Sequence, residues 1–389
     1  MKILSMAWSI YDERMPEFRH NYTGGGMMIK NICEYIGRKQ ESYLFIGRCK
    51  LPGTILGNIH IVDTESFSDA DEGNEGLDDK EGHLSRMTRA FEIAIEHINP
   101  DIVNFHGIGV LMQCCIEVCR KKNIPFVYTD HLFIGAEMDI QGYGPNIEYQ
   151  KKVYHIPDIK VIAVSTGMKR KILYDFPHIP SENIFVIRNG TDFLVQRESG
   201  GLQEKYDLEH KKVLLCVGTL NYRKNQCQIV KAFQLLPSYI QENVKVIFCG
   251  KDSMDGELQK SIINMGLQGN LIYVGAVSNA EMKHYYSVAD GLIMASYAEG
   301  LSIAALEAIA YGLPIIMFKD SECAEDLDDK RVVCFAKERS DKGLANAMKE
   351  WYDIEWDRGY IIKYSKNFTM DRVADEYIEY YKKLLSFMP

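Results

Sequence analysis

Two glutamates, Glu299 and Glu307, are separated by seven residues in the segment EGLSIAALEAIAYGLPII, which runs from Glu299 to Ile316. Carboxylates accept hydrogen bonds from hydroxyl groups, and they repel a phosphate that is placed against them. We therefore expect one carboxylate on each side of a bound anion, with sugar hydroxyls on one side and ribose hydroxyls on the other. A bound nucleotide-sugar is the leading hypothesis. The alternative is that Glu299 is solvated and Glu307 lies on a helix surface.

The elements around this pair are expected to place it beside a phosphate. Gly291–Ala295 is typical of a short buried strand, Ser296–Gly300 of a polar turn, and Ile303–Tyr311 of a helix. The helix would begin at the carboxyl end of the strand, where its free N–H groups and its dipole favour an anion. The residues expected to face that anion are Gly300, Leu301, Ser302 and Ile303.

A basic pair follows another strand about eighty residues earlier. Val213–Val217 is an uninterrupted apolar run, Gly218 permits a tight turn, and Arg223 and Lys224 then open a predicted helix. Arginine offers a planar fork and lysine a mobile point charge, so together they suit a diphosphate whose charge grows as it leaves. The alternative is a solvated basic pair, although cations are disfavoured at a helix start.

Three consecutive glycines lie near the amino terminus. Gly24, Gly25 and Gly26 precede a predicted helix, and a backbone without side chains can approach a ligand closely. No Gly-x-Gly-x-x-Gly pattern is present, and Arg48 follows the second strand where an acid would hold a ribose, so a nicotinamide site is disfavoured. A merely flexible loop is the alternative.

Two histidines, His106 and His131, each follow an apolar strand, in DIVNFHG and IPFVYTDH. Both are therefore expected at the carboxyl edge of a sheet, where parallel sheets bind ligands. For an isolated histidine, a satisfied structural role is the alternative.

The chain resembles glycosyltransferase family 4, the retaining enzymes of the GT-B fold, in motifs that are dispersed over most of its length. Their order and spacing carry the resemblance. The motifs are the Gly24–Gly26 loop, TDH ending at His131, AVS ending at Ser165, RNGTD from Arg188 to Asp192, VGTLNYRKN from Val217 to Asn225, FCG ending at Gly250, and the segment with two glutamates.

The resemblance implies a role for each matching residue. Arg223 and Lys224 would hold the diphosphate, Glu307 the ribose and Glu299 the donor sugar, and His131 would lie near the anomeric carbon, with His106 as a weaker acceptor-side candidate. The donor site would also include Gly25, Gly26, Gly218, Thr219, Gly250 and the segment from Gly300 to Ile303. The chain has Thr219, Ala304 and Asn104 where many members have arginine, proline and histidine.

The activity implied by the resemblance is transfer of a sugar, with retention, from a nucleotide-diphosphate donor to a hydroxyl of a glycan, glycolipid or other acceptor, in polysaccharide or glycoconjugate biosynthesis. A UDP-sugar is favoured over a GDP-sugar. No protein nucleophile is evident, and we expect no cofactor and no metal. Two alternatives stay open: a nucleotide-sugar 2-epimerase of the same architecture, and a nucleotide-sugar-binding protein without turnover.

Composition agrees with an enzyme that binds anions locally. A formal net charge of −9 and a pI of 5.7 argue against a nucleic-acid-binding protein. The ten cysteines are scattered without a pairing framework, which suits a reducing cytosol. No apolar run approaches a membrane span, so we expect a cytoplasmic protein. The oligomeric state is not indicated.

Peripheral contact with an anionic membrane is a further hypothesis. It rests on the basic clusters Arg120–Lys122, Lys151–Lys152 and Lys169–Lys171, which have tyrosines beside them. Solvated helix ends are the alternative.

Apolar strands alternate with helical stretches through both halves of the 389 residues, which predicts an α/β protein with two Rossmann-like, doubly wound parallel sheets facing across a cleft. We expect an acceptor-side domain over residues 1–195 and a nucleotide-sugar-binding domain over residues 196–367. The last segment, about 368–389, contains an amphipathic helix with Val373, Tyr377, Tyr380 and Leu384 on one stripe. By analogy with the resembled fold, it crosses back onto the first domain.

Overall fold

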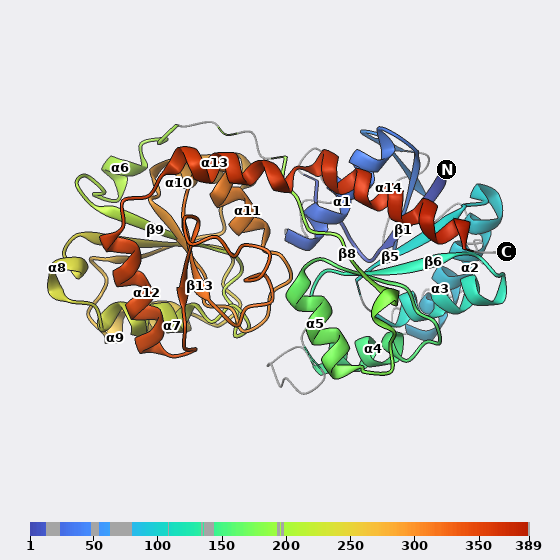
Figure 1. Ribbon diagram of the computed structural model, residues 1–389, viewed down its shortest axis with the longest axis horizontal. Coiled ribbons are helices and arrows are strands. Elements are labelled where there is room, and N and C mark those ends of the chain that lie inside the picture. The colour runs from blue at the N-terminus through green and yellow to red at the C-terminus, as the bar shows by residue number, and fades with distance from the viewer. Residues whose placement is uncertain are drawn as a thin grey trace.

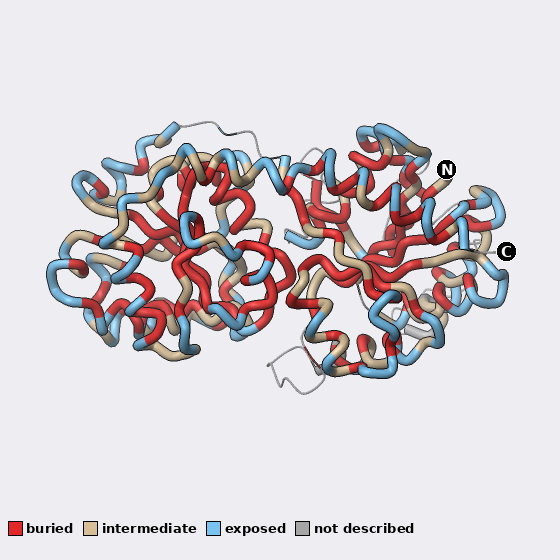
Figure 2. The backbone as a smooth tube through the Cα atoms, in the orientation of Figure 1, coloured by how far each residue is buried: buried red, intermediate tan, exposed pale blue. Residues whose placement is uncertain are grey.

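The computed structural model describes residues 1–12, 24–47, 54–62, 80–107, 109–133, 135, 144–192, 195 and 198–387. Each half of the chain forms a β-sheet with helices packed on both faces (Figure 1). The buried backbone, red in Figure 2, follows the strands and the inner sides of the helices.

The first sheet has the strand order β3-β4-β2-β1-β5-β6-β7-β8. Its strands are β1 (Lys2–Ala7), β2 (Glu41–Ile46), β3 (Ile55–Leu56), β4 (Ile59–Val62), β5 (Ile102–His106), β6 (Phe126–Asp130), β7 (Val161–Ala163) and β8 (Ile184–Val186). All neighbours are parallel except β3 and β4. One face packs against α2 (Lys80–Ile98), α3 (Val110–Lys121), α4 (Gly144–Tyr154) and α5 (Thr166–Asp175), and the other against α1 (Gly24–Gly37) and the C-terminal α14 (Met370–Ser386).

The second sheet is wholly parallel, in the order β11-β10-β9-β12-β13-β14. Its strands are β9 (Lys212–Val217), β10 (Val244–Cys249), β11 (Leu271–Gly275), β12 (Gly291–Ile293), β13 (Ile315–Phe318) and β14 (Val333–Ala336). One core contains residues of α7 (Gln226–Gln234), α8 (Ser238–Gln241), α9 (Glu257–Asn264) and α12 (Asp341–Asp353). The other contains residues of α6 (Leu202–Lys205), α10 (Asn279–Val288), α11 (Ile303–Ala310) and α13 (Arg358–Ser365). Short 3₁₀ turns lie at η2 (Ser181–Asn183) and η3 (Lys366–Phe368).

The predicted fold class, two doubly wound parallel sheets, is confirmed, and every strand predicted from an apolar run is present. The sequence gives no signal for β3, because two residues in an antiparallel pair with β4 are too short to form a run. The step from the first sheet to the second lies between β8 and β9, and residue 196, at the predicted domain boundary, is outside the described residues.

Two helix starts differ from the prediction. Gly24, Gly25 and Gly26 form the first turn of α1 and are not a loop before it. Helix α7 begins at Gln226, after Asn225 in the left-handed region with a φ of 52°, so the basic pair lies in the turn before the helix. Asparagine adopts this conformation more readily than most residues, and it stops the helix from extending backwards.

In both sheets the strand order reverses beside a central strand, β1 in the first and β9 in the second. The chain connections on the two sides of this strand cross the sheet in opposite directions. The loops at the carboxyl end of the strand therefore separate and leave a crevice between them. The segments that follow β9 and β12 carry the basic pair and Glu299, respectively.

The final helix, red in Figure 1, lies across the first half of the molecule. Its predicted stripe is buried, and Val373, Tyr377, Tyr380 and Leu384 share an apolar cluster with residues of α1 and of the first sheet. A buried hydrogen bond of 2.7 Å, from Asn104 Nδ2 to Tyr381 Oη, also joins β5 to α14. The side chain of Asn104 is thereby committed to the interior of this half.

No helix in the described ranges combines the length and the apolar composition that a membrane crossing requires.

Candidate active site

Two glycines shape the loops at the carboxyl ends of β9 and β10. Gly218 and Gly250 have φ angles of 139° and 156°, and a Cβ on Gly250 would lie 2.0 Å from the carbonyl oxygen of Gly218. Any side chain at Gly250 would therefore push the β9 loop away. Thr219 continues that loop, and its carbonyl accepts a hydrogen bond of 3.1 Å from Gln226 Nε2 on α7.

The turn after this loop presents the basic pair. The backbone N–H of Lys224 donates to Asn221 Oδ1 at 2.9 Å, and the carbonyl of Arg223 accepts from the N–H of Tyr297 at 2.8 Å. These bonds tie the β9 turn to the β12 loop. Arg223 Nη1 also donates to the carbonyl of Ala298 at 2.6 Å. Both cations therefore lie directly beside Glu299.

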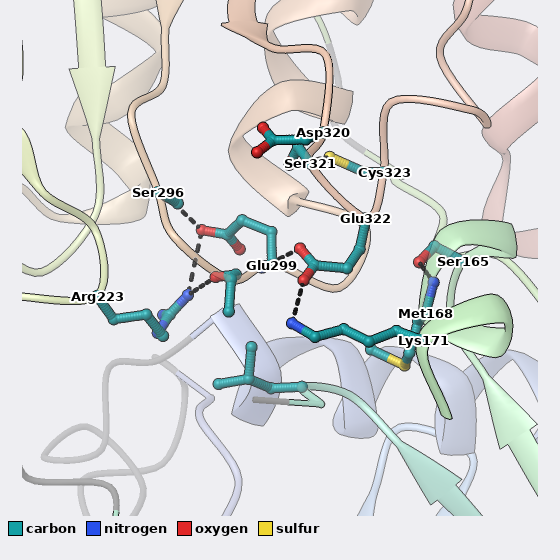
Figure 3. A network of polar contacts seen from close by, with 12 residues as sticks. Ser165, Met168, Lys171, Arg223, Ser296, Glu299, Asp320, Ser321, Glu322 and Cys323 are labelled. Carbon is teal, nitrogen blue, oxygen red and sulfur yellow. Dashed lines mark hydrogen bonds and ion pairs between the residues drawn. The ribbon is translucent and has the colours of Figure 1, made fainter. Parts of the chain in front are cut away.

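Glu299 is buried and ion-paired with both cations, and Figure 3 shows its contact with Arg223. Its Oε1 accepts hydrogen bonds from Lys224 Nζ and, at 2.9 Å, from Ser296 Oγ, and it lies 3.3 Å from Arg223 Nη1. Burial alone would raise the pKa of Glu299, but Lys224 and Arg223 outweigh it and lower the pKa to about 2. In this cluster two half-buried cations therefore face one buried carboxylate.

Helix α11 begins beside this cluster. Leu301 and Ser302 are buried, and the carbonyl of Leu301 accepts a hydrogen bond of 2.8 Å from Asn189 Nδ2 of the first half. The side chain of Ser302, the N-cap residue, makes no capping hydrogen bond, so it leaves the first amides of α11 to another acceptor. Ile303 packs near Gly24, where an added Cβ would lie 3.7 Å from its side chain.

Glu307 is buried one turn further along α11, where its Oε2 accepts a hydrogen bond of 2.7 Å from Tyr286 Oη on α10. Burial raises the pKa of Glu307 to about 7, with a further contribution from Asp192, while the tyrosine hydrogen bond opposes the shift. Glu307 is not on an exposed helix surface. Tyr286 and Asp192 come from distant parts of the chain, so no local pattern in the sequence indicates their contact with Glu307.

A cavity of about 340 Å³ lies between the two halves and is lined by Glu307. The first half contributes residues from the end of β1, from α1 and from the segment after β8, including Tyr11, Met27, Asn31 and Asp192. Gly25 has open space where a Cβ would lie, whereas Gly26 is buried in the first turn of α1. The start of α1 and the start of α11 therefore meet at one crevice.

His106, which is buried, and His131, which is half-buried, form a stacked pair. His106 Nδ1 lies 2.9 Å from His131 Nε2, and the ring centroids are 5.2 Å apart. Burial lowers the pKa of His131 to about 4 and that of His106 well below its usual value, so both rings are neutral at pH 7. One proton bridges the pair, and among the described residues the outer atoms His106 Nε2 and His131 Nδ1 have no hydrogen-bond partner.

The sequence-predicted residues fall into two groups. The two halves touch where Gly300 packs against the backbone of His131, since a Cβ on Gly300 would lie 2.5 Å from the carbonyl oxygen of His131. His131 is therefore close in space to Glu299, which in turn contacts Arg223 and Lys224. Glu307 belongs with the cavity and the glycines of α1. His106 is connected to this first group through its contact with His131. Sequence reasoning missed Ser296, which contacts Glu299 within the same loop. It also missed Glu322 and Lys171, which reach Glu299 through contacts between distant segments.

Within the described part of the chain, no group of three or more His, Cys, Asp or Glu side chains could hold a metal ion. Catalysis without a metal stays a prediction.

The sequence matches the family Glycosyl transferases group 1 over residues 202–368 and the family Glycosyltransferase Family 4 over residues 74–193. It is 24% identical over 308 residues to an uncharacterised glycosyltransferase of Methanocaldococcus jannaschii, an alignment that covers 73% of this chain and 74% of the relative. It is 22% identical over 250 residues to O-antigen chain mannosyltransferase B of Escherichia coli, covering 61% of this chain and 65% of the relative, slightly under two thirds of that protein.

The fold is similar to those of solved glycosyltransferases. A glycosyltransferase from Rickettsia africae superposes with a TM-score of 0.74 at 17% identity, covering 100% of this chain and 99% of the other. HepE of Anabaena, solved in complex with UDP-glucose, superposes with a TM-score of 0.72 at 15% identity, covering 98% and 100%. The two family matches, one in each half, and the two-sheet architecture agree. The chain belongs to glycosyltransferase family 4, and it is a hexosyltransferase-type glycosyltransferase with the GT-B fold.

Proposed function

We propose that the protein transfers a hexose, with retention of the anomeric configuration, from a nucleotide-diphosphate donor to a hydroxyl of a glycan or lipid-linked glycan in glycoconjugate or polysaccharide biosynthesis. The observation that carries this proposal is the buried cluster of Arg223, Lys224 and Glu299 beside the start of α11. Two adjacent cations favour an anion, and the amides of α11 add donors for the same anion.

The proposed roles follow from the charges. The diphosphate takes over contacts with Arg223 and Lys224, and Glu299 then becomes available to the hydroxyls of the donor sugar. Glu307, which lines the cavity between the halves, accepts hydrogen bonds from the ribose hydroxyls. The backbone carbonyl of His131 packs against Gly300, the residue after Glu299. This contact supports a place for His131 beside the reacting carbon.

The chemical step breaks the bond between the anomeric carbon and the diphosphate oxygen, and the electron pair leaves with the diphosphate. The acceptor hydroxyl oxygen forms the new bond on the same face, and its proton passes to an oxygen of the departing phosphate. Arg223 and Lys224 stabilise the charge that develops on that phosphate, and Glu299 orients the sugar. This scheme uses no protein nucleophile and no metal.

A UDP-sugar is our first choice of donor, because HepE, which shares the fold, was solved in complex with UDP-glucose. A GDP-sugar is the second choice. For the acceptor, the name O-antigen chain mannosyltransferase B, carried by a relative, favours a lipid-linked glycan.

Thermal unfolding with UDP, GDP, ADP and NAD tests the donor site. A ligand at a hundred times its dissociation constant stabilises the folded state by about 2.7 kcal/mol. We expect one diphosphate to raise the melting temperature, and the shift to vanish in Lys224→Ala and Glu307→Ala. A cooperative melt that none of the four ligands moves would remove the basis for the donor site.

Turnover then separates the three activities. A transferase releases nucleotide from the matching sugar donor only in step with a glycosylated acceptor, and the product keeps the donor's anomeric configuration by NMR. Nucleotide release without an acceptor indicates the 2-epimerase. Tight donor binding without release indicates a binding protein.

Membrane contact and a cytoplasmic location stay predictions. The basic clusters lie at different positions along their helices, because Lys169–Lys171 is in the middle of α5 whereas Lys151–Lys152 is in the last turn of α4. Several of these cations are also paired, such as Lys122 with Glu92 and Glu96. Co-sedimentation with anionic vesicles at low salt tests the contact.

A further inference from the structure

We propose that Lys171 is a positioning residue, which acts across the domain boundary through Glu322 to hold Glu299 in its sugar-binding place. Closure of the two domains would then complete the active site. This inference rests on the proposed role of Glu299, and it assigns a function to two residues that are not among the predicted donor-site or acceptor-side residues.

The contact is a chain of two polar interactions (Figure 3). Lys171, on α5 of the first half, places Nζ 2.8 Å from Glu322 Oε1 in the loop after β13 of the second half. The other oxygen, Glu322 Oε2, accepts the backbone N–H of Glu299 at 3.0 Å. One carboxylate thereby joins a cation of the first domain to the backbone of the sugar-binding residue in the second.

Burial makes this carboxylate depend on its cation. The side chain of Glu322 is 7% exposed, and it lies beside the backbone of a second buried carboxylate, Glu299. Glu299 has Arg223 and Lys224 as its own cations, whereas Lys171 is the cation bound to Glu322 in the described structure. Removal of one partner from a buried pair leaves an uncompensated charge, which moves toward water or takes up a proton. In either case the acceptor for the Glu299 N–H is disturbed.

The domains meet here by direct backbone contact, which makes the geometry specific. A Cβ on Gly167, at the start of α5, would lie 2.3 Å from the carbonyl oxygen of Glu322. On the other side, a Cβ on Gly300 would lie 2.5 Å from the carbonyl oxygen of His131. Gly300 and Glu322, which both lie beside Glu299, therefore touch the backbone of the first domain. These backbone contacts leave no room for a side chain on Gly300 or on Gly167.

A second ionic contact fixes the same two segments. Asp326 accepts hydrogen bonds from the backbone N–H and the Oγ1 of Thr166 at 2.8 and 2.6 Å, and from Arg188 Nε at 2.7 Å. This contact aligns the start of α5 with the loop after β13. Because it does not reach Glu299, it holds the domains together without replacing the Lys171 contact.

Opening of the domains would separate Lys171 from Glu322 and release the Glu299 backbone. Sugar orientation is then complete only in the closed state, when water is excluded from the reacting carbon. Nucleotide binding needs no such closure, because Arg223, Lys224, Glu307 and α11 all belong to the second domain. The inference therefore predicts a loss of turnover that is separate from any loss of nucleotide affinity.

The test compares Lys171→Met with Arg170→Met. Arg170 is the neighbouring cation on α5, and it pairs with Glu325 of the same loop, but at the surface, with side chains 65% and 38% exposed. We expect Lys171→Met to lower kcat by about tenfold or more, a part of the roughly hundredfold effect of losing a direct transition-state contact. The dissociation constant of the nucleoside diphosphate should stay within about twofold of the wild type. Arg170→Met should leave both values unchanged, and Lys171→Arg should restore most of the lost kcat.

Two substitutions of Glu322 separate its charge from its role as an acceptor. Glu322→Gln can still accept the Glu299 N–H, whereas Glu322→Met cannot, so kcat should fall further in the methionine variant. A Lys171→Met or Glu322→Met variant that melts lower but keeps a wild-type kcat would overturn the inference and leave the proposed function intact. A wild-type protein that neither binds a nucleoside diphosphate nor transfers a sugar would remove the proposed function, and this inference with it.

Discussion

At the scale of single residues, the two buried glutamates of the motif have pKa values that are shifted in opposite directions, because only Glu299 has cations beside it in the described structure. Glu299 keeps its charge because two cations touch it, and its pKa lies near 2. Glu307 accepts a hydrogen bond from the hydroxyl of Tyr286 and has no cation bound to it in the described part of the chain, and its pKa rises to about 7. The first carboxylate is therefore a permanent anion, whereas the second gains or loses its charge near neutral pH.

Loss of the Glu299 or the Lys224 side chain should abolish most of the turnover. We expect Glu299→Ala and Lys224→Ala each to lower kcat by roughly a hundredfold or more, the scale of one lost transition-state contact. Steady-state kinetics of the matched donor measures this. Lys349→Ala, which removes an exposed lysine paired with Asp353 on α12, is the control and should be neutral. Near-normal turnover from a folded Lys224→Ala protein would discard the site.

The raised pKa of Glu307 predicts a pH-dependent nucleotide affinity. Ribose hydroxyls donate to the ionised carboxylate, so binding has to remove the proton that the free protein holds below about pH 7. Affinity for the diphosphate should therefore rise about tenfold between pH 6 and pH 8. Calorimetric titration across this range measures it. In Glu307→Gln only the titration of the ligand itself should remain, and an unchanged slope would contradict the assignment.

The raised pKa of Glu307 also makes the stability of the ligand-free protein depend on pH. Since the pKa is raised on folding, the stability contribution of protonated Glu307 is full below its ordinary value of 4.5 and is lost as pH rises through about 7. The melting temperature should reflect this loss, and Glu307→Gln should not show it.

At the scale of elements, the site depends on loops that meet without side chains between them. The halves touch through Gly300 and Gly167, and the β9 and β10 loops touch through Gly218 and Gly250. Each contact brings one backbone against another, so its tolerance for an added methyl group is small.

A methyl group at Gly300 should separate the domains locally. In Gly300→Ala the new Cβ would meet the carbonyl oxygen of His131 and the side chain of Val164, and relief of such overlap typically costs about 1–3 kcal/mol. We expect a lower melting temperature and a loss of kcat, because His131 and Glu299 move apart. Gly269→Ala, where nothing lies within 4 Å of the added Cβ, is the control. Equal activity in both variants would contradict a closed contact in solution.

The hydrogen bond between β5 and α14 predicts a measurable cost for one hydroxyl. In Tyr381→Phe the buried Asn104 Nδ2 loses its acceptor, and an unsatisfied buried donor costs about 1–3 kcal/mol. Urea unfolding should show this loss, while transfer kinetics should change little. Tyr174→Phe, at a side chain that is 84% exposed, should leave stability unchanged. No difference between the two variants would mean that water replaces the bond.

The sequence predicted the elements well and the contacts between them poorly. Apolar runs such as Val213–Val217 indicate buried strands because both faces of a parallel sheet are covered. The start of α7 was misplaced, because the left-handed conformation of Asn225 is a local choice that hydrophobic patterning does not report. Tyr286, Glu322 and Lys171 could not be predicted as site residues, since each reaches the site across at least 20 residues of chain.

At the scale of the whole molecule, each half needs the other to complete its structure. The catalytic cluster lies in the second half, yet the first half supplies His131, Lys171 and part of the cavity that Glu307 lines. The first half in turn takes α14 from the far end of the chain. The two domains are therefore linked by shared structure as well as by the site between them.

Removal of α14 should damage the first half selectively. Deletion from residue 369 onwards uncovers apolar residues of α1 and of the first sheet, among them Ile3, Met28 and Ile32. We expect the shortened protein to bind a hydrophobic dye and to aggregate, because an exposed apolar face of this kind favours association. A synthetic α14 peptide added in trans should reduce dye binding. A shortened protein that stays monomeric and active would contradict a structural role for α14.

The position of α14 also bears on the order in which the protein is assembled. A ribosome releases the strands of the first sheet early, and domains made first generally fold first. Here that sheet stays without one of its covering helices until residues 370–386 have been synthesised, by which time the whole second sheet is available to fold. The sheet that is synthesised first is thus covered only after the second sheet has been made. Until then, nascent chains carry an uncovered apolar surface of the kind that chaperones bind.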